Sequence, residues 1–320
     1  MPRVSIAIRA FRRRWLAEAI ASVLAQTHRD LELVIYDDAG DFEPLATATR
    51  DARIRYHRAE GRRTASGRFA AAVALCHGEY VGLLDDDDAY APDFVARLAA
   101  ALDTDPEAGA AFCRTTWDDD GRRVRPVDAR SSGRQPDAAA TMLRDGWTVS
   151  PSHLLLRRCA YDHALRDQAL PPGVLPDIFV NLRLAMAGWH HVLVDAPLVV
   201  TRWHAGQFTR MYPLAGDTAV ATWRTIHIDD PALTALRDRR LARSLLVRAV
   251  DALRAGDVVQ ARGDVIAAAD AAPGAWRALR LAVGRAAACG LPGVWAARVW
   301  AAMSPRGRRR RRPPRRIGDR

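Results

Sequence analysis

Short strand-like runs and amphipathic helical segments alternate through residues 1–117, and this alternation restricts the fold more than any other feature. The strand-like runs are rich in apolar, β-prone residues and occupy positions 4–8, 31–36, 54–57, 79–84 and 108–116. The helical segments carry apolar residues at three- and four-residue spacing and occupy positions 15–26, about 66–76, and a stretch that begins at Pro92. This alternation predicts an α/β fold in which a mostly parallel sheet lies between two layers of helices.

The pattern loosens after Trp117 and becomes helical towards the C-terminus. Strand-like runs at 154–157 and 192–204 flank a helical segment at 177–187, and alanine-rich helical segments follow at 241–255 and 258–271. We therefore expect three regions: an α/β domain over residues 1–210, a helical region over 211–303, and a disordered arginine-rich tail over 304–320.

The charge and cysteine content limit the class of protein. The chain has a net charge of +11 and contains no lysine, and much of its excess arginine lies in residues 306–320. Charge alone therefore does not predict a nucleic-acid-binding protein, because the body without this tail is only mildly basic. The four cysteines form no C-x-x-C pair, the N-terminus opens directly on a strand, and Arg285 and Arg298 interrupt the best apolar stretch, residues 281–303. We expect a cytoplasmic protein.

Acidic residues follow two strands of the predicted sheet. Asp37 and Asp38 end the second strand, and four consecutive aspartates, residues 85–88, end the fourth. Ligands of such sheets bind at the carboxyl ends of the strands. Four adjacent carboxylates repel one another, and a divalent cation such as Mg²⁺ or Mn²⁺ with a diphosphate ligand would relieve that repulsion. The alternative interpretation is a solvated acidic turn that caps the helix starting at Pro92.

The ordered set of motifs resembles family 2 glycosyltransferases of the GT-A fold across roughly residues 2–210. The matching segments stand in the family's order and comprise residues 4–8, 19–27, 34–38 and 78–88, with Pro92 beyond them. The resemblance implies a three-layer α/β/α sandwich with a mostly parallel sheet, followed here by a C-terminal helical region. It further implies that residues 1–117 bind a nucleotide-sugar donor and that residues 118–210 bind the acceptor.

The resemblance also implies roles for individual donor-site residues. Asp38 corresponds to the aspartate that accepts a hydrogen bond from the donor's base, and Asp86 to the residue that holds the ribose hydroxyls. Asp87 corresponds to the D-x-D carboxylate that ligates Mn²⁺ or Mg²⁺, with Asp85 close to it. This chemistry also follows from the residue type, because carboxylates accept from N–H and O–H donors and bind hard cations.

The loop after the first strand departs from the family pattern. Phe11 keeps the family's aromatic and Arg13 its basic position, whereas Arg9, Ala10 and Arg12 are substitutions. The arginines either help to hold the diphosphate or are surface residues of an arginine-rich chain. In the helix before the fourth strand, Arg68 is displaced by one residue from the family's arginine, and its asparagine partner is absent.

Two residues on the acceptor side match the family less closely. Asp177, at a predicted helix start, corresponds to the general base that deprotonates the acceptor hydroxyl, although an aspartate there also stabilises the helix dipole. His204 follows the last strand-like run, where the family often carries a histidine near the metal and diphosphate. Trp147 and Trp203 could stack on a sugar or pack in a core.

Together these features imply an inverting, metal-dependent, hexosyltransferase-like enzyme. It would move a sugar from a nucleoside-diphosphate sugar, with a UDP-type donor favoured, to an acceptor hydroxyl. The acceptor would be a glycan, a lipid-linked glycan or a small molecule, in the synthesis of cell-surface polysaccharide, glycolipid or another glycoconjugate.

Two alternatives remain at this point. A nucleotidyltransferase would normally show a glycine-rich phosphate loop after the first strand, and residues 9–14 contain no glycine. The other alternative is a basic RNA- or membrane-binding protein on an inactive glycosyltransferase fold. Binding through the tail could coexist with catalysis, and we favour peripheral attachment to an anionic surface at the inner face of the membrane over nucleic acid.

Overall fold

The computed structural model describes residues 2–10, 14–38, 50–61, 63–119, 121–124, 130–146, 149–204 and 216–272. The chain divides into two compact units. The described part of the first unit reaches His204 and leaves out residues 140–147, which belong to the second unit together with residues 216–272. The expected domain boundary at 210 and the expected tail over 304–320 lie outside the described residues.

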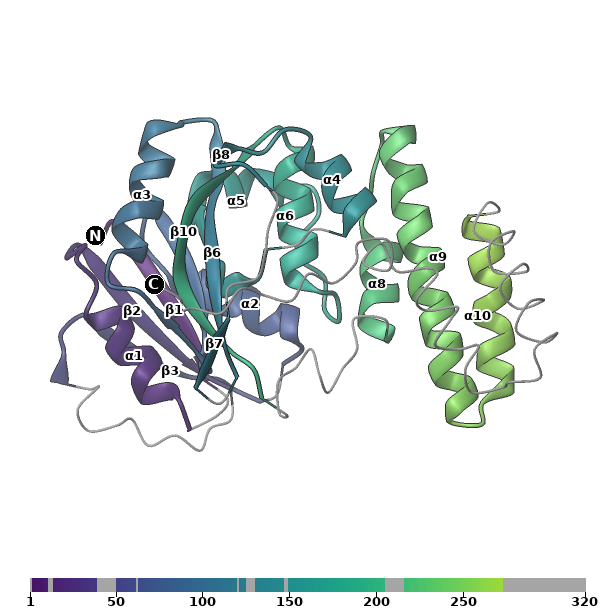
Figure 1. The fold of residues 1–320 in the computed structure, drawn as a ribbon, viewed down its shortest axis with the longest axis horizontal. Helices are drawn as coiled ribbons and strands as arrows, with labels where there is room; N and C mark the ends of the chain where they lie inside the picture. Colours follow the sequence, from purple (N-terminus) through teal and green to yellow (C-terminus); the bar gives the residue numbers. More distant parts are fainter. Residues whose placement is uncertain are drawn as a thin grey trace. The chain divides into compact units, whose positions relative to one another are not determined.

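The first unit contains a single mixed sheet with helices on both faces (Figure 1). Its strands are β1 Val4–Ala10, β2 Leu31–Asp37, β3 Ile54–Arg58, β4 Tyr80–Asp85, β5 Asp88–Tyr90, β6 Ala108–Asp119, β7 Arg122–Val124, β8 Gly133–Arg134, β9 Leu154–Arg157 and β10 His190–Arg202. Its helices are α1 Leu16–Leu24, α2 Ala65–Leu75, α3 Phe94–Thr104, α5 Arg158–Ala164, α6 Pro176–Met186 and the short 3-10 helix η2 Pro151–His153. Helix α4, Ala138–Asp145, crosses the division between the units.

The sheet order is β3-β2-β1-β4-β9-β6-β10-β5. The neighbours β3, β2, β1 and β4 run parallel, and so do β6 and β10. Strand β9 is antiparallel to β4 and β6, and β5 is antiparallel to β10. Strands β1, β2, β4, β6 and β10 therefore all end at the same edge of the sheet.

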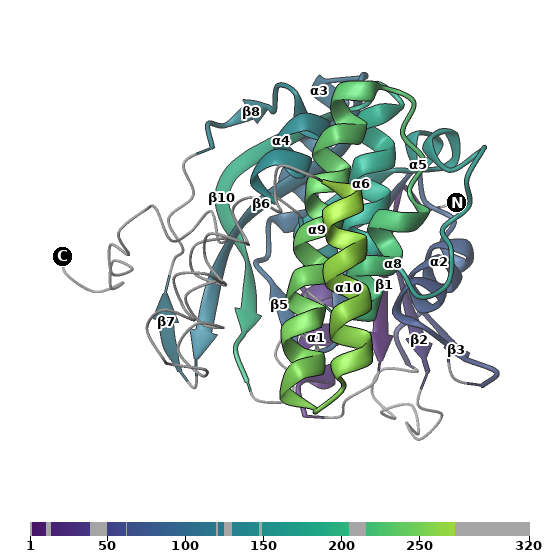
Figure 2. The same cartoon turned by 90° about the vertical axis from the view of Figure 1, so that its right-hand side faces the viewer.

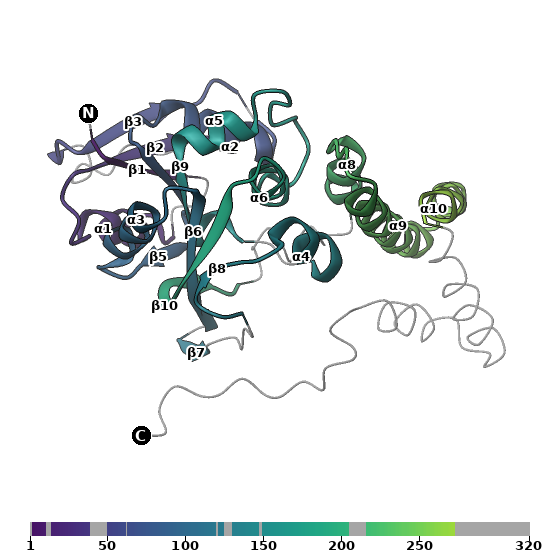
Figure 3. The same ribbon diagram turned by 90° about the horizontal axis from the view of Figure 1, so that it is seen from above.

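The helices form the two outer layers of a three-layer α/β/α sandwich. Seen from above, α1 and α3 lie on one face of the sheet and α2, α5 and α6 on the other (Figure 3). The largest apolar cluster fills the space between the sheet and the first pair, and its members include Ile6, Ile8, Ile20, Phe94 and Leu98, each at most 6% exposed. The predicted three-layer sandwich around a mostly parallel sheet is confirmed.

The side chain of Gln26 joins α1 to α3 and so fixes the chain beyond the acidic run. Its side chain is fully buried, and its amide nitrogen donates to the carbonyls of Ser22 and Ala91, at 2.9 and 2.7 Å. Its carbonyl oxygen accepts from the backbone N–H of Val95 at 2.9 Å, which satisfies a free donor in the first turn of α3. Helix α3 begins at Phe94, so Pro92 lies just before the helix and does not occupy its first position.

The second unit contains the helices α8 Asp217–Thr225, α9 Pro231–Arg254 and α10 Val258–Ala271. Figure 2 shows α9 and α10 side by side and antiparallel. Their apolar contact involves Leu245, Leu246 and Ala268, and the buried Asp264 accepts two hydrogen bonds from Arg248, at 2.8 and 2.7 Å. The predicted C-terminal helical region is confirmed for these residues. No helix in the described ranges has the length and apolarity to cross a membrane.

Candidate functional site

The two acidic segments lie on either side of β1 at the edge where the parallel strands end. Strand β1 pairs with β2 so that Ala10 lies beside Asp37, and it pairs with β4 so that Arg9 lies beside Asp85. Asp38 follows β2 directly. The sheet topology thus brings together residues that are almost fifty positions apart in the sequence.

Asp38 is held in place from α2. Its side chain is 2% exposed, and its Oδ2 accepts from a guanidinium nitrogen of Arg68 at 2.9 Å. Helix α2 is fixed at its start by Thr64, whose hydroxyl accepts from the backbone N–H of Gly67 at 3.1 Å. The other carboxylate oxygen of Asp38 is buried and has no hydrogen-bond partner within the described part of the chain. A buried, unsatisfied acceptor next to a fixed one is suited to an N–H donor of a ligand.

Asp37 has a structural environment, in contrast to Asp38. It is fully buried, and its Oδ2 accepts from the hydroxyl of Tyr56 at 2.6 Å. Burial, and then the hydrogen bond to this carboxylate, raise the pKa of Tyr56 to about 12. The Asp37–Asp38 pair therefore divides into one residue that joins β2 to β3 and one that faces the site.

Three of the four consecutive aspartates converge. Asp85, Asp87 and Asp88 each offer one carboxylate oxygen, and these oxygens lie within 4.8 Å of one another. Asp86 is also buried but does not belong to this group. Asp88 was not assigned a role from the sequence. It opens β5, which pairs antiparallel with β10 so that Asp88 lies beside Thr201.

The electrostatics of this cluster favour a cation. Burial, and then the charges of Asp87 and Asp85, raise the pKa of Asp88 well above its usual range. The Arg9 guanidinium forms an ion pair with Asp85. Carboxylate oxygens are the donors that Mn²⁺ and Mg²⁺ prefer, and a divalent cation among them would offset the repulsion between these carboxylates. The residues present therefore fit a divalent metal.

The end of β10 supplies further groups to the cluster. The imidazole Nε2 of His204 lies 3.0 Å from Oδ2 of Asp87. The backbone N–H of Arg202 donates to Oδ1 of Asp88 at 3.3 Å, and its guanidinium donates to the backbone carbonyl of Asp87 at 2.9 Å. His204 thus lies next to the residue predicted to ligate the metal. Its own role as a ligand stays a prediction.

Ser152 in η2 also contacts the acidic run, although no motif in the sequence identified it. Its hydroxyl accepts from the backbone N–H of Asp85 at 3.1 Å. Its neighbour His153 contacts the hydroxyl of Thr201 through Nε2 at 2.9 Å, and burial lowers the pKa of His153 to about 4. The Pro-Ser-His turn stands at no characteristic spacing from the other motifs that would have identified Ser152 as a site residue. Its proximity to Asp85 depends on the antiparallel pairing of β9 with β4.

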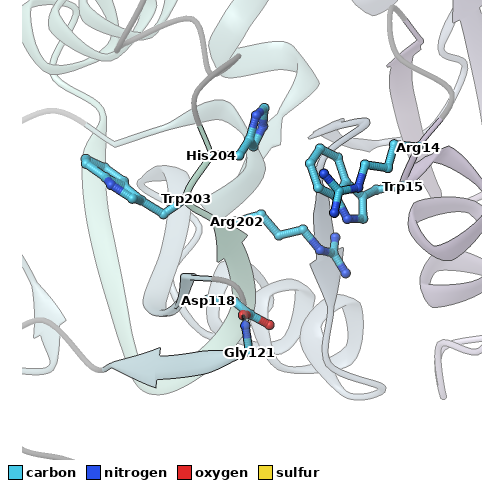
Figure 4. Close-up of a pocket in the computed structure, with 7 residues that line it drawn as sticks. All are labelled: Arg14, Trp15, Asp118, Gly121, Arg202, Trp203 and His204. Carbon is cyan, nitrogen blue, oxygen red and sulfur yellow. Dashed lines mark hydrogen bonds between the residues drawn. The ribbon is translucent and has the colours of Figure 1, made fainter.

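A pocket of about 290 Å³ lies beside this cluster. In Figure 4 the rings of Trp203 and Trp15 lie at the left and right of the pocket, with Arg202 and His204 between them and Asp118 below. The rings of Trp15 and His204 are in contact, with centroids 4.6 Å apart. Arg14 and Arg202 bring two guanidinium groups to the pocket, which suits anionic or hydroxyl-bearing ligands.

The remaining predicted site residues are placed less fully. Asp177 is half-buried in the first turn of α6, where Pro176 is the first residue of the helix. Its backbone carbonyl accepts from the side-chain amide of Asn181 at 2.7 Å. The predicted donor-binding residues Phe11 and Arg13 lie outside the described residues.

Comparison with protein families and curated proteins agrees with this geometry. A family described as glycosyl transferase family 2 matches residues 5–165. An uncharacterized glycosyltransferase of Nostoc sp. is 28% identical over 167 residues, which cover 49% of this chain and 50% of that protein. The succinoglycan biosynthesis protein ExoO of Rhizobium meliloti is 31% identical over 126 residues, 38% of this chain and 35% of that protein. The chain thus spans half or less of the length of these relatives.

Solved structures share the fold at low identity. TarS of S. aureus, crystallised as residues 1–349 in complex with UDP-GlcNAc, superposes with a TM-score of 0.60 and 12% identity, covering 84% of this chain and 92% of that one. The mannosyltransferase PcManGT of Pyrobaculum calidifontis, solved with GDP-Man and Mn²⁺, gives a TM-score of 0.54 and 19% identity, covering 96% and 87%. These likenesses show that the fold is GT-A-like.

Proposed function

The chain belongs to glycosyl transferase family 2, and from this membership we propose that it transfers a sugar from a nucleoside-diphosphate sugar to an acceptor hydroxyl with inversion at the anomeric carbon. The observation that carries the proposal is the placement of Asp38 on one side of β1 and of the Asp85–Asp87–Asp88 cluster on the other, at the same edge of the sheet. A nucleotide-sugar donor has its base at one end and its diphosphate at the other, so it needs an acceptor for the base N–H and a separate cation site for the diphosphate.

The donor's base and ribose would lie at the Asp38 end. The unsatisfied Oδ1 of Asp38 would accept the N3–H of uracil, while Arg68 fixes the carboxylate through Oδ2. Asp86 would hold the ribose hydroxyls, and Phe11 and Arg13 would complete the nucleotide site. The UDP complex of a structural neighbour agrees with a uridine donor, which is the donor we favour.

The diphosphate would lie at the other end, over a divalent cation held by Asp87, with Asp85, Asp88 and His204 beside it. When bound, Mn²⁺ or Mg²⁺ supplies Lewis-acid stabilisation of the departing nucleoside diphosphate, typically worth several kcal/mol. The Arg202 guanidinium, which lines the adjoining pocket, would add positive charge near the phosphates.

Asp177 would act as the general base for the acceptor. Its carboxylate would take the proton of the attacking hydroxyl, which then displaces the nucleotide from the opposite face of the anomeric carbon in a single step. General base catalysis of this kind contributes about 10²- to 10⁴-fold to the rate. The names of the relatives, such as a succinoglycan biosynthesis protein, favour a role in polysaccharide or glycoconjugate synthesis.

The proposal is tested by separating donor binding from transfer. UDP and GDP would be titrated into the protein with and without Mn²⁺ and followed by calorimetry, and turnover of their sugar conjugates would be followed by nucleotide release. We expect Asp87→Ala to abolish turnover and to weaken nucleotide binding, because it removes a metal ligand. Asp177→Asn should abolish turnover and leave nucleotide binding nearly intact.

Two outcomes would contradict the proposal. If neither UDP nor GDP binds in the presence of Mn²⁺, the proposed donor site is wrong. If Asp177→Asn transfers the sugar as the wild type does, Asp177 is not the general base. Release of pyrophosphate in place of a nucleoside diphosphate would indicate nucleotidyl transfer.

A further inference from the structure

Two tryptophans are exposed at the edge of the sheet that carries the candidate site. Trp117 is 40% exposed and Trp203 is 36% exposed. Among the described residues of the first unit, no other large hydrophobic side chain is as exposed as these two. Paired exposed aromatics on an otherwise polar surface are typical of binding sites, since their exposure to water is unfavourable.

The sheet holds these two side chains together. Trp117 lies in β6 beside Thr201 of β10, and the backbone N–H of Trp203 donates to the carbonyl of Asp118 at 2.8 Å. The two indole rings are stacked, with centroids 5.8 Å apart and planes inclined by 29°. Because neighbouring strands fix both residues, the pair forms a preorganised aromatic surface that loses little side-chain entropy on binding.

A series of contacts connects this aromatic pair to the acidic run. Side chains two positions apart on a strand share a face, so Trp117 lies on the same face of β6 as Thr115, and it is beside Thr201 in the register. The hydroxyls of Thr115 and Thr201 are 2.9 Å apart, and His153 reaches Thr201 from the same side. The residue before His153, Ser152, accepts from Asp85, as described above.

The position of the pair identifies it with the acceptor and not with the nucleotide. Asp38 follows β2, whereas the tryptophans extend from β6 and β10, beyond β4 and its aspartates in the sheet order. Thr201 lies beside Asp88, and Trp203 is two residues farther on, about 7 Å along an extended chain. A molecule on the tryptophans would therefore lie about one sugar ring from the acidic cluster, on the side away from the base.

We propose that Trp117 and Trp203 form an acceptor subsite that stacks against a pyranose ring, so that the acceptor is a saccharide. This inference rests on the proposed function. The C–H face of a pyranose is apolar and fits an indole surface, while its ring-edge hydroxyls need polar partners. The hydroxyls of Thr115 and Thr201 lie on the face of Trp117 and are such partners, and Trp203 also lines the pocket beside the acidic cluster.

The test is saturation-transfer-difference NMR with a fixed panel of probes in the presence of UDP and Mn²⁺. The panel contains the methyl pyranosides of glucose, galactose, mannose, rhamnose and N-acetylglucosamine, together with cellobiose and maltose. We expect at least one saccharide to bind. The double variant Trp117→Ala/Trp203→Ala should weaken that binding by about tenfold or more, since truncated tryptophan anchors typically lose this much.

Two control variants separate stacking from a loss of structure. Trp117→Phe/Trp203→Phe keeps aromatic faces and should stay within about threefold of the wild type, a difference of under 1 kcal/mol. Val259→Ala, an 85% exposed residue of α10, should bind as the wild type does. Nucleotide binding is measured on every variant and should not change, which shows that the donor site is intact.

Each outcome decides a separate point. Nucleotide binding without binding of any saccharide on the panel overturns the acceptor inference and leaves the donor site standing. Saccharide binding that survives in the double alanine variant also overturns it. If neither nucleotide nor saccharide binds, the proposed function itself fails. Saccharide binding that is lost in the alanine variant and kept in the phenylalanine variant supports the inference.

Discussion

Acidification should destabilise the first unit through His191, a fully buried histidine in β10. Its Nε2 lies 3.0 Å from Oδ1 of Asn181. The amide nitrogen of Asn181 donates to the carbonyl of Asp177, so its oxygen faces the imidazole and the histidine must donate from Nε2. This contact is made by a neutral imidazole. Burial, and then the charge of His190, lower the pKa of His191 to about 3.

The sign and size of the effect follow from proton linkage. The pKa of His191 is lower in the folded protein than the ordinary value of about 6.5, so the unfolded chain binds the proton more tightly. The stabilising contribution is complete above pH 6.5 and declines as the pH falls from there towards 3. At pH 5.5 protonation of this one group in the unfolded chain lowers the free energy of unfolding by about 1.4 kcal/mol. That free energy corresponds to a fall in melting temperature of about 3–6 °C for a unit of this size.

The assay compares the wild type with His191→Gln, which keeps an N–H donor towards Asn181 but cannot take up a proton. Melting temperatures are measured by calorimetry at pH 7.5 and 5.5. The variant should lose about 3–6 °C less than the wild type between the two values. The other ionisable groups are the same in both proteins, so their contributions cancel in this difference. An equal loss in the two proteins would show that His191 is not held neutral by the fold.

Further predictions concern close packing, the base site and the metal. Gly78→Ala should destabilise the protein by about 1–3 kcal/mol in chemical denaturation, because a Cβ there would lie 2.6 Å from the backbone nitrogen of Ser5. The control is Gly263→Ala in α10, where a Cβ meets nothing within 4 Å, and it should be neutral or stabilising. Asp38→Ala should weaken UDP binding by about tenfold in calorimetry, since it removes a charged acceptor, and an unchanged affinity would place the base elsewhere. Adding EDTA should abolish the rise in melting temperature that UDP and Mn²⁺ produce together; a rise that persists would indicate metal-independent binding.

The central elements of the fold could be predicted because their signals are local. Strands β1, β2 and β4 are mostly apolar runs that are buried along nearly their whole length, and α1 presents one apolar stripe to the sheet. Strand β5 could not be predicted in the same way. It has three residues, begins with an aspartate, and is stable as a strand only because it pairs with β10, more than one hundred positions away.

The candidate site shows the same division between local and distant information. Asp38 and Asp87 could be identified because each directly follows or closely follows a strand whose end forms the binding edge. Asp88 and Ser152 could not, because their proximity to the other groups depends on the pairing of β5 with β10 and of β9 with β4. Trp117 was overlooked for a related reason, since its partner Trp203 lies on a different strand and their stacking is a property of the register.

The four consecutive aspartates illustrate how one residue type acquires different roles from its surroundings. Asp85 carries an arginine partner, Asp87 a histidine partner, and Asp88 a raised pKa in the absence of either. The surroundings therefore differ at each of these three positions. The same arrangement gives a cation three oxygen donors whose mutual distances already suit it. Arg9, a departure from the family pattern, belongs to this arrangement because it neutralises Asp85 from the neighbouring strand.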